Sequence, residues 1–208
     1  RLQKALEEML PELGKNMEIM GFYLGIMLDK ENAFGYLYGS EDSEEKVMVR
    51  SFEGLLEMLF SADHGSVKRY KSDQTIELYD FEYDGNSKLR NDFKDLLKIR
   101  EGALCFVKRF CENSLSDVIR WDKTMAFDAI CRLGTETRQS DLNRFGNWSF
   151  YANNTISPLA KPNRGVYFSF LKLKKGISSS PWKIGYLKRF LKIPLPYLRI
   201  YKWFMHDQ

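Results

Sequence analysis

One short stretch of the sequence has residue types that could support nucleophilic or acid–base chemistry. Asp63, His64 and Ser66 follow one another closely, and Ser61 stands just before them. A histidine beside a serine and an aspartate offers the groups of a nucleophile activated by a general base. Neighbours on one turn rarely reach that geometry, because a third group from elsewhere in the fold must orient the base. The catalytic residues are therefore unknown from the sequence, with these residues as candidates and an exposed turn histidine as the simpler interpretation.

The sequence predicts neither a metal site nor a cofactor site. His64 and His206 lie far apart, and the three cysteines form no pair with the spacing of metal ligands. No glycine-rich loop has the spacing of a phosphate-binding fingerprint. An odd number of scattered cysteines is typical of a reducing compartment, where a free thiol behaves as a small hydrophobe.

Charge is distributed unevenly along the chain. The total of +4 includes eleven Lys or Arg and one acid from Lys161 onward, a net +10, which leaves −6 for residues 1 to 160. Such a basic tail predicts an anionic partner: a membrane, a phosphate-bearing substrate, nucleic acid or an acidic part of the same protein. We do not expect nucleic acid, because the rest of the chain is acidic and carries no recognised binding motif.

The basic tail has the pattern of two short amphipathic helices. Residues 183 to 193 place apolar side chains on one face, Pro194 and Pro196 interrupt the pattern, and a second helix is expected around residues 197 to 204. Helices of this kind can lie in a membrane interface. Alternatively, their aromatic side chains pack on the body of the protein while the lysines face water. The candidate residues for membrane or anion binding are Trp182, Lys183, Tyr186, Lys188, Arg189 and Lys192.

Two helices between Arg50 and Phe110 are expected to position His64. Each carries an apolar stripe at helical spacing, so the two should pack on each other with the polar bridge between them. We expect Ser51 to cap the first helix, and Val47 to Val49 to form a short strand before it. The first stripe is Phe52, Leu55, Leu56, Leu59 and Phe60, and the second is Leu96, Leu97, Ala103, Leu104, Val107 and Phe110.

The N-terminal part predicts a helix followed by a buried strand. Residues 1 to 13 have a helical pattern that stops at Gly14, and Met17 to Leu28 is an almost unbroken apolar run. Such a run suggests a strand buried on both faces, as in a parallel sheet. It could pair in a hairpin with Tyr36 to Tyr38, or it could be the last helix–strand unit of a larger α/β domain lying upstream. Both alternatives remain open from the sequence.

Together these elements predict an α+β fold that is mainly helical. We divide it into a helix–strand unit (residues 1–50), a helical body (51–146) and an irregular basic extension ending in amphipathic helices (147–208). Apolar residues make up 44% of the 208, enough for a sizeable core. No apolar run approaches the roughly 20 residues that cross a bilayer, and the N-terminus lacks signal-peptide features. We expect a cytoplasmic protein, with placement at the inner face of the plasma membrane left open, and a chain beginning with Arg1 suggests a fragment.

Several blocks resemble the C-terminal region of bacterial surface-polysaccharide biosynthesis proteins, in which a haloacid-dehalogenase-like domain is associated with glycosyltransferase modules. The blocks are residues 51 to 70, 101 to 110 and 181 to 188, and Met-Gly-Phe-Tyr-Leu-Gly-Ile at residues 20 to 26 is similar to the strand that closes the preceding α/β portion. The Asp-x-Asp that such an active site requires after a buried strand is missing, so no catalytic residue is carried over.

The resemblance implies a non-catalytic region that gives scaffolding and placement at a membrane surface. Its partners would be upstream modules of the same protein and an anionic membrane. The alternative is an enzyme that acts on a phosphorylated sugar or another anion near His64.

Overall fold

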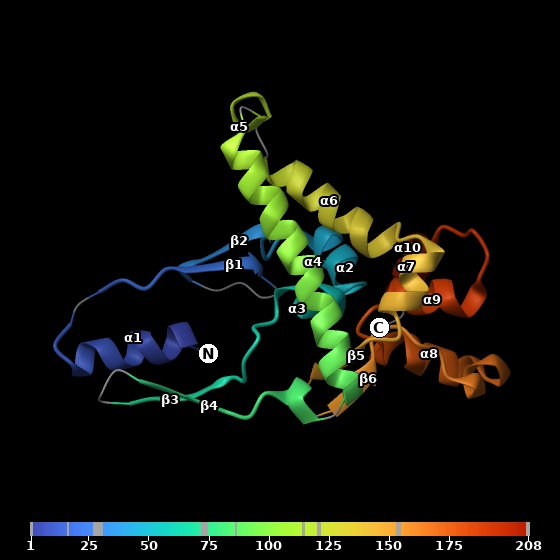
Figure 1. Cartoon of the computed structure of the whole chain (residues 1–208), viewed down its shortest axis with the longest axis horizontal. Coiled ribbons are helices and arrows are strands. Elements are labelled where there is room, and N and C mark those ends of the chain that lie inside the picture. Colours follow the sequence, from blue (N-terminus) through green and yellow to red (C-terminus); the bar gives the residue numbers. More distant parts are fainter. Residues whose placement is uncertain are drawn as a thin grey trace. The chain divides into compact units, whose positions relative to one another are not determined.

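The computed structural model describes residues 2–15, 17–26, 31–71, 75–85, 87–113, 115–119, 122–152 and 155–206. The chain divides into two compact units, Arg1–Arg50 with Trp121–Cys131, and Ser51–Arg120 with Arg132–Gln208. Helices dominate both, and the strands of the described part form small two-stranded sheets (Figure 1). The predicted class, α+β and mainly helical, is confirmed.

The first unit contains two helices, a pair of strands and the first turns of a further helix. Helix α1 is followed by Gly14, whose φ of +67° lies in the left-handed region that favours glycine, so the predicted stop is confirmed. Strands β1 and β2 pair in parallel, which makes the hairpin interpretation wrong. The elements are α1 (Leu2–Glu12), β1 (Gly21–Gly25), β2 (Ala33–Tyr38), α2 (Ser43–Arg50) and the start of α6 (Lys123–Thr135).

Strand β1 exposes the apolar side chains that were expected to be buried on both faces. Phe22 is 79% exposed, and Tyr23 and Leu24 are exposed as well. The Phe22 ring stacks on Phe34 of β2, with 5.5 Å between centroids. Parallel strands normally have both faces covered. Because these side chains are exposed, the prediction that β1 is buried on both faces is wrong within this chain. The end of the expected strand, at Met27 and Leu28, lies outside the described residues.

Helix α2 replaces the short strand expected at Val47 to Val49. Glu44 and Glu45 lie in its first turn and Arg50 in its last, which is the charge order that the helix dipole favours. The Asp42 carboxylate accepts a hydrogen bond from the Gly39 amide at 2.7 Å and so fixes the turn before the helix. Periodicity over so few residues did not separate strand from helix.

The second unit holds the remaining elements. They are α3 (Glu53–Phe60), β3 (Val67–Tyr70), β4 (Ile76–Leu78), η1 (Glu82–Gly85), α4 (Ser87–Glu112), α5 (Leu115–Val118), α7 (Gln139–Phe145), β5 (Ser149–Ala152), β6 (Thr155–Pro158), η2 (Arg164–Phe168), α8 (Phe170–Ser179), α9 (Lys183–Leu191) and α10 (Tyr197–His206). Strands β3 and β4 form one antiparallel pair, and β5 and β6 form another.

The C-terminal helices belong to the core of this unit. Trp182 is fully buried, and its indole Nε1 donates a hydrogen bond to the Gly134 carbonyl at 2.7 Å. The Ile184 amide donates to the Ser51 carbonyl at 3.2 Å, so Ser51 is held in the core rather than acting as the expected helix cap. Gly134 lies against the Phe52 ring so closely that a Cβ there would overlap it. Residues far apart in the sequence thus share one core.

Helix α4 is buried along only part of its length. Leu89, Phe93 and Leu96 are buried, whereas Leu104 is 69% exposed and Val107 is exposed. Of the stripe predicted on α4, only Leu96 is buried, so the prediction that the stripes of α3 and α4 pack together is confirmed at Leu96 alone and is wrong from Ala103 to Val107.

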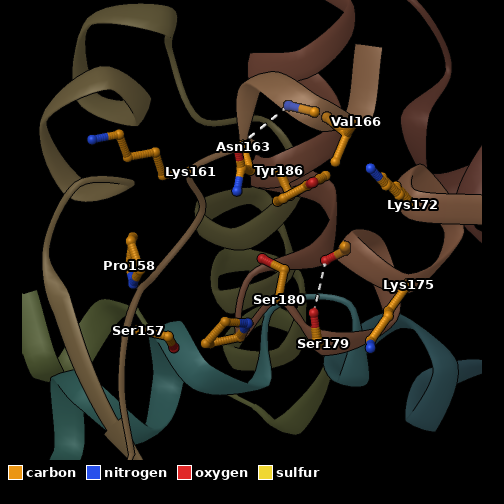
Figure 2. A pocket seen from close by; sticks show the side chains of 13 residues that line it. Ser157, Pro158, Lys161, Asn163, Val166, Lys172, Lys175, Ser179, Ser180 and Tyr186 are labelled. Atoms are coloured by element: carbon orange, nitrogen blue, oxygen red, sulfur yellow. Dashed lines mark hydrogen bonds between the residues drawn. The ribbon is translucent and has the colours of Figure 1, made fainter. Parts of the chain in front are cut away.

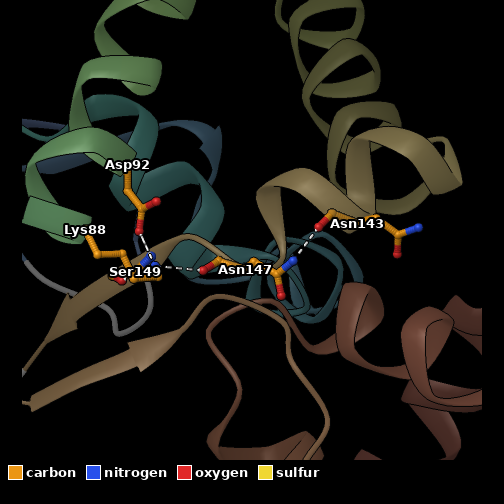
Figure 3. Close-up of polar contacts among 5 residues, drawn as sticks. All are labelled: Lys88, Asp92, Asn143, Asn147 and Ser149. Carbon is orange, nitrogen blue, oxygen red and sulfur yellow. Dashed lines mark hydrogen bonds and ion pairs between the residues drawn. The ribbon is translucent and has the colours of Figure 1, made fainter.

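Polar contacts join α4 to the β5–β6 hairpin (Figure 3). The Asp92 carboxylate accepts a hydrogen bond from the Ser149 amide at 2.9 Å, and Lys88 Nζ donates to Ser149 Oγ at 2.7 Å. Lys88 also donates to the Asn147 carbonyl at 3.1 Å, and the Asn147 side-chain amide donates to the Asn143 carbonyl at 2.7 Å. These bonds fix the hairpin that forms one wall of the pocket described next.

Candidate functional site

The predicted catalytic candidates do not assemble into a catalytic site. His64, Asp63 and Ser66 are all exposed, and His64 Nδ1 lies 2.8 Å from the Gly65 carbonyl oxygen. His64 lines a cavity of about 420 Å³ together with Glu57 and other side chains, and its described lining contains no lysine or arginine. The charged residues there are acidic, so an anionic substrate would be repelled rather than bound.

The tail residues that were candidates for a membrane surface divide into buried and exposed groups. Trp182 is fully buried and Tyr186 is 5% exposed, so neither ring is free to enter a lipid interface. For these two aromatics the packing interpretation holds and the membrane interpretation is wrong. Lys192 is exposed just after α9, with a left-handed φ of 58°. Lys183 is half-buried beside Glu53 and Glu57 in a small cavity of about 260 Å³.

Lys188 and Arg189 hold the fold together. Lys188 Nζ donates to the Thr137 carbonyl at 3.4 Å, and burial lowers the pKa of this amine. Arg189 donates from Nη1 to the Ala160 carbonyl at 2.8 Å and from Nη2 to Asn147 Oδ1 at 2.9 Å. Both cations thus bond to backbone or amide oxygens, which makes them structural rather than ligand-binding in this conformation.

A different group of residues forms a basic pocket of about 460 Å³. Strand β6 and the loop after it supply one wall, α8 supplies another, and Tyr186 of α9 lies between them (Figure 2). Lys172, Lys175, Gly176 and Ser179 recur at helical spacing and so share one face of α8. The lining residues are Ser157, Pro158, Lys161, Asn163, Gly165, Val166, Lys172, Lys175, Gly176, Ser179, Ser180, Pro181 and Tyr186.

Three lysines contribute to the lining of the basic pocket, and its described lining contains no carboxylate. Figure 2 shows Lys172 and Lys175 on one side, Lys161 on the other with its ammonium extending outward, and Asn163 and Tyr186 between them. Among the residues that the structure describes, none of the three lysines has a carboxylate within ion-pair distance. Unneutralised cations in a concave site concentrate the field that attracts anions.

Gly176 brings the Tyr186 hydroxyl close to α8. A Cβ at position 176 would overlap that hydroxyl oxygen, so only glycine permits the approach. Burial raises the pKa of Tyr186, with the nearby Tyr167 adding to the effect. The phenol therefore stays protonated at neutral pH and can donate a hydrogen bond into the basic pocket.

Large apolar side chains surround the start of α8 and continue on α10. Phe168 is 90% exposed and Leu171 is 79% exposed, and Phe170 and Trp203 are also exposed. The ring of Phe204 connects the last two, lying 5.9 Å from Phe170 and 5.1 Å from Trp203 between centroids. We call Phe168, Phe170, Leu171 and Trp203 the aromatic patch. Leu171 is four residues before Lys175, so the aromatic patch borders the basic pocket on the surface of α8.

The sequence analysis predicted neither the basic pocket nor the aromatic patch, although residues of both stand out in the sequence. The mixture of aromatics and lysines between Tyr167 and Lys175 was visible, but periodicity cannot tell which of several aromatic residues the fold covers.

Within the described residues no three His, Cys, Asp or Glu side chains are grouped as metal ligands. No helix in the described part of the chain is long and apolar enough to cross a bilayer.

No protein-family model matches this chain, and searches of curated proteins and of solved structures found no significant match.

Proposed function

We propose that this chain is a non-catalytic region of a bacterial surface-polysaccharide biosynthesis protein that holds neighbouring modules and attaches peripherally to an anionic membrane. The observation that carries the membrane part is the aromatic patch, where Phe168 and Leu171 are almost fully exposed beside basic residues. Exposed apolar side chains flanked by lysines are the two ingredients of interfacial binding. The polysaccharide context rests on the sequence resemblance.

The positive charge of the tail also supports membrane attachment through this surface. Between Lys161 and His206 the sequence contains eleven Lys or Arg and no Asp or Glu. Each Lys or Arg near an anionic bilayer contributes on the order of 1 kcal/mol of attraction, and apolar burial contributes about 25 cal/mol per Å². Neighbouring residues of α8 can supply both the electrostatic attraction and the apolar burial, so membrane binding needs no rearrangement of the fold.

The scaffolding part is supported by strands β1 and β2. A two-stranded parallel sheet with exposed apolar faces is marginal by itself, and parallel sheets normally have both faces covered. Phe22, Phe34 and Tyr36 are all more than half exposed. Packing against an α/β module of the same protein would cover these side chains.

The membrane proposal is tested by sedimentation with lipid vesicles. Removing residues 181 to 208 is unsuitable, because Trp182, Ile184 and Tyr201 are fully buried and the unit would lose its core. The Phe168→Ser/Leu171→Ser variant keeps the core and removes the two most exposed side chains of the aromatic patch. A matched control is Leu104→Ser/Phe106→Ser, which removes exposed apolar groups from α4.

Wild type should bind phosphatidylglycerol vesicles and not phosphatidylcholine vesicles at about 0.1 M salt. The Phe168→Ser/Leu171→Ser variant should bind at least about tenfold more weakly, because burying one such side chain contributes about 1.5–3 kcal/mol. The α4 control should bind like wild type. Equal binding by all three proteins, or an equal loss in the control, would refute the proposal.

The rival proposal of an enzyme acting at His64 has no comparable support. Its cavity is lined by acidic residues, and His64 is bonded to a neighbouring carbonyl rather than to a nucleophile.

A further inference from the structure

We propose that the basic pocket binds a phosphate group, carried either on a membrane lipid as a phosphomonoester or diphosphate, or free in solution as the same ion. Its lipid-borne source rests on the membrane attachment proposed above, whereas the phosphate chemistry rests on the pocket alone.

Charge selects an anion with more than one negative charge. Lys172 and Lys175 lie on one side of the pocket and Lys161 on the other, and the described lining contains no carboxylate (Figure 2). A phosphomonoester carries about −1.5 to −2 charges at neutral pH and offers three strong acceptor oxygens, so it complements the pair Lys172 and Lys175 better than a single carboxylate does. Lysine is a common phosphate ligand that acts as a point charge from a flexible stem.

Neutral hydrogen-bond donors in the pocket would orient a bound phosphate. Ser157 and Tyr186 contribute hydroxyl groups and Asn163 contributes a side-chain amide, whereas Ser179 Oγ already donates to the Gly176 carbonyl at 3.4 Å. Asn163 Oδ1 accepts a hydrogen bond from the Gly165 amide at 3.3 Å, which leaves its NH₂ group available to donate. A volume of about 460 Å³ admits a phosphate or diphosphate with part of the group attached to it.

The position of the pocket explains how a lipid phosphate would reach it. Leu171 and Lys175 are neighbours on α8, so an apolar chain inserted at Leu171 and a charge bound at Lys175 lie side by side. In a bilayer the phosphate groups of lipids lie just outside the apolar region. Insertion of Phe168 and Leu171 would therefore bring the mouth of the basic pocket to the level of the phosphates.

Binding is tested in solution by calorimetry with the whole chain. The probes are inorganic pyrophosphate, dioctanoyl phosphatidic acid below its micelle concentration and, as a zwitterionic control without net charge, dioctanoyl phosphatidylcholine. The variant is Lys172→Gln/Lys175→Gln, and its matched control is Lys94→Gln/Lys98→Gln, which removes two lysines from exposed positions of α4. Gly176→Ala tests shape without changing charge, because its methyl group must displace the Tyr186 hydroxyl.

Wild type and the α4 control should bind pyrophosphate, and Lys172→Gln/Lys175→Gln should bind it about 10- to 30-fold more weakly, about fivefold per lysine. Gly176→Ala should also bind more weakly, with circular dichroism confirming the fold of each variant. The inference would be overturned if the two double-lysine variants bound pyrophosphate with equal affinity. It would also be overturned if wild type bound neither pyrophosphate nor phosphatidic acid.

The lipid arm separates this inference from the proposed function. Phosphatidic acid bound more tightly than pyrophosphate supports a lipid source, and pyrophosphate alone supports a free phosphate in the same pocket. Vesicle binding that depends on Phe168 and Leu171, together with no phosphate binding in solution, would leave membrane attachment standing and reject the pocket. Phosphate binding without vesicle binding would support the phosphate pocket and reject membrane attachment.

Discussion

Replacement of Trp182 tests whether the basic tail is core or surface. The side chain is fully buried, and its indole donates a 2.7 Å hydrogen bond to the Gly134 carbonyl. Trp182→Phe keeps an aromatic ring but leaves a buried carbonyl without this donor, which costs about 1–3 kcal/mol. Trp182→Ala also opens a cavity and should cost about 3–5 kcal/mol, a large part of the 5–15 kcal/mol that stabilises a typical domain.

The assay is urea unfolding followed by far-ultraviolet circular dichroism, which does not depend on the tryptophan that is removed. Trp203→Phe is the matched control, because Trp203 is 60% exposed and its replacement should change the free energy of unfolding by less than about 0.5 kcal/mol. If Trp182→Phe and Trp203→Phe had the same small effect, the tail would not be packed as the structure describes.

Three further predictions follow from single side chains. Partial desolvation raises the pKa of Glu57, with Glu53 adding to the shift and Lys183 opposing it, although much of the residue is exposed. Stability from this group is full below pH 4.5 and is lost as pH rises through the folded-state pKa, so Glu57→Gln should raise the melting temperature slightly at pH 7 and not at pH 3. Burial raises the pKa of Cys131 to about 12, so iodoacetamide at pH 8 should modify the exposed Cys105 and spare Cys131 in mass spectra. Asp92→Ala should cost about 1–3 kcal/mol in urea unfolding, because it leaves the Ser149 amide without its acceptor.

Results that would contradict these three are equally direct. An Asp92→Ala protein as stable as wild type would show that the contact between α4 and the hairpin is dispensable. Equal labelling of both cysteines would show that Cys131 is accessible, and a melting temperature independent of Glu57 at both pH values would show that its carboxyl group is not desolvated.

Local pattern predicted the C-terminal helices well. Helical spacing around Tyr186 and the breaks at Pro194 and Pro196 correspond to α9 and α10, because each signal acts within a few residues. The same pattern could not show that Trp182 would be buried. That outcome depends on Gly134 and Ser51, which lie far away in the sequence and meet the tail only after folding.

Exposure was the harder property to predict. The apolar run around Phe22 and the stripe at Leu104 and Val107 both suggested burial, yet the structure leaves these side chains exposed. Hydrophobic pattern shows that a surface can be covered, but not whether this chain contains the surface that covers it. The basic pocket was beyond sequence reasoning for a related reason, since Asn163, Lys172 and Tyr186 come together only through the packing of three segments.

The most direct test of membrane attachment is the contact between Trp203 and lipid. Trp148 and Trp182 are buried, so in a Trp121→Phe background the fluorescence that responds to a bilayer should come from Trp203. Phosphatidylglycerol vesicles with bromine on the upper part of the acyl chains should quench this emission, and Trp203→Phe should abolish the quenching. Emission unchanged by brominated vesicles, under conditions where the protein sediments with them, would show that the aromatic patch stays in water and would contradict the account.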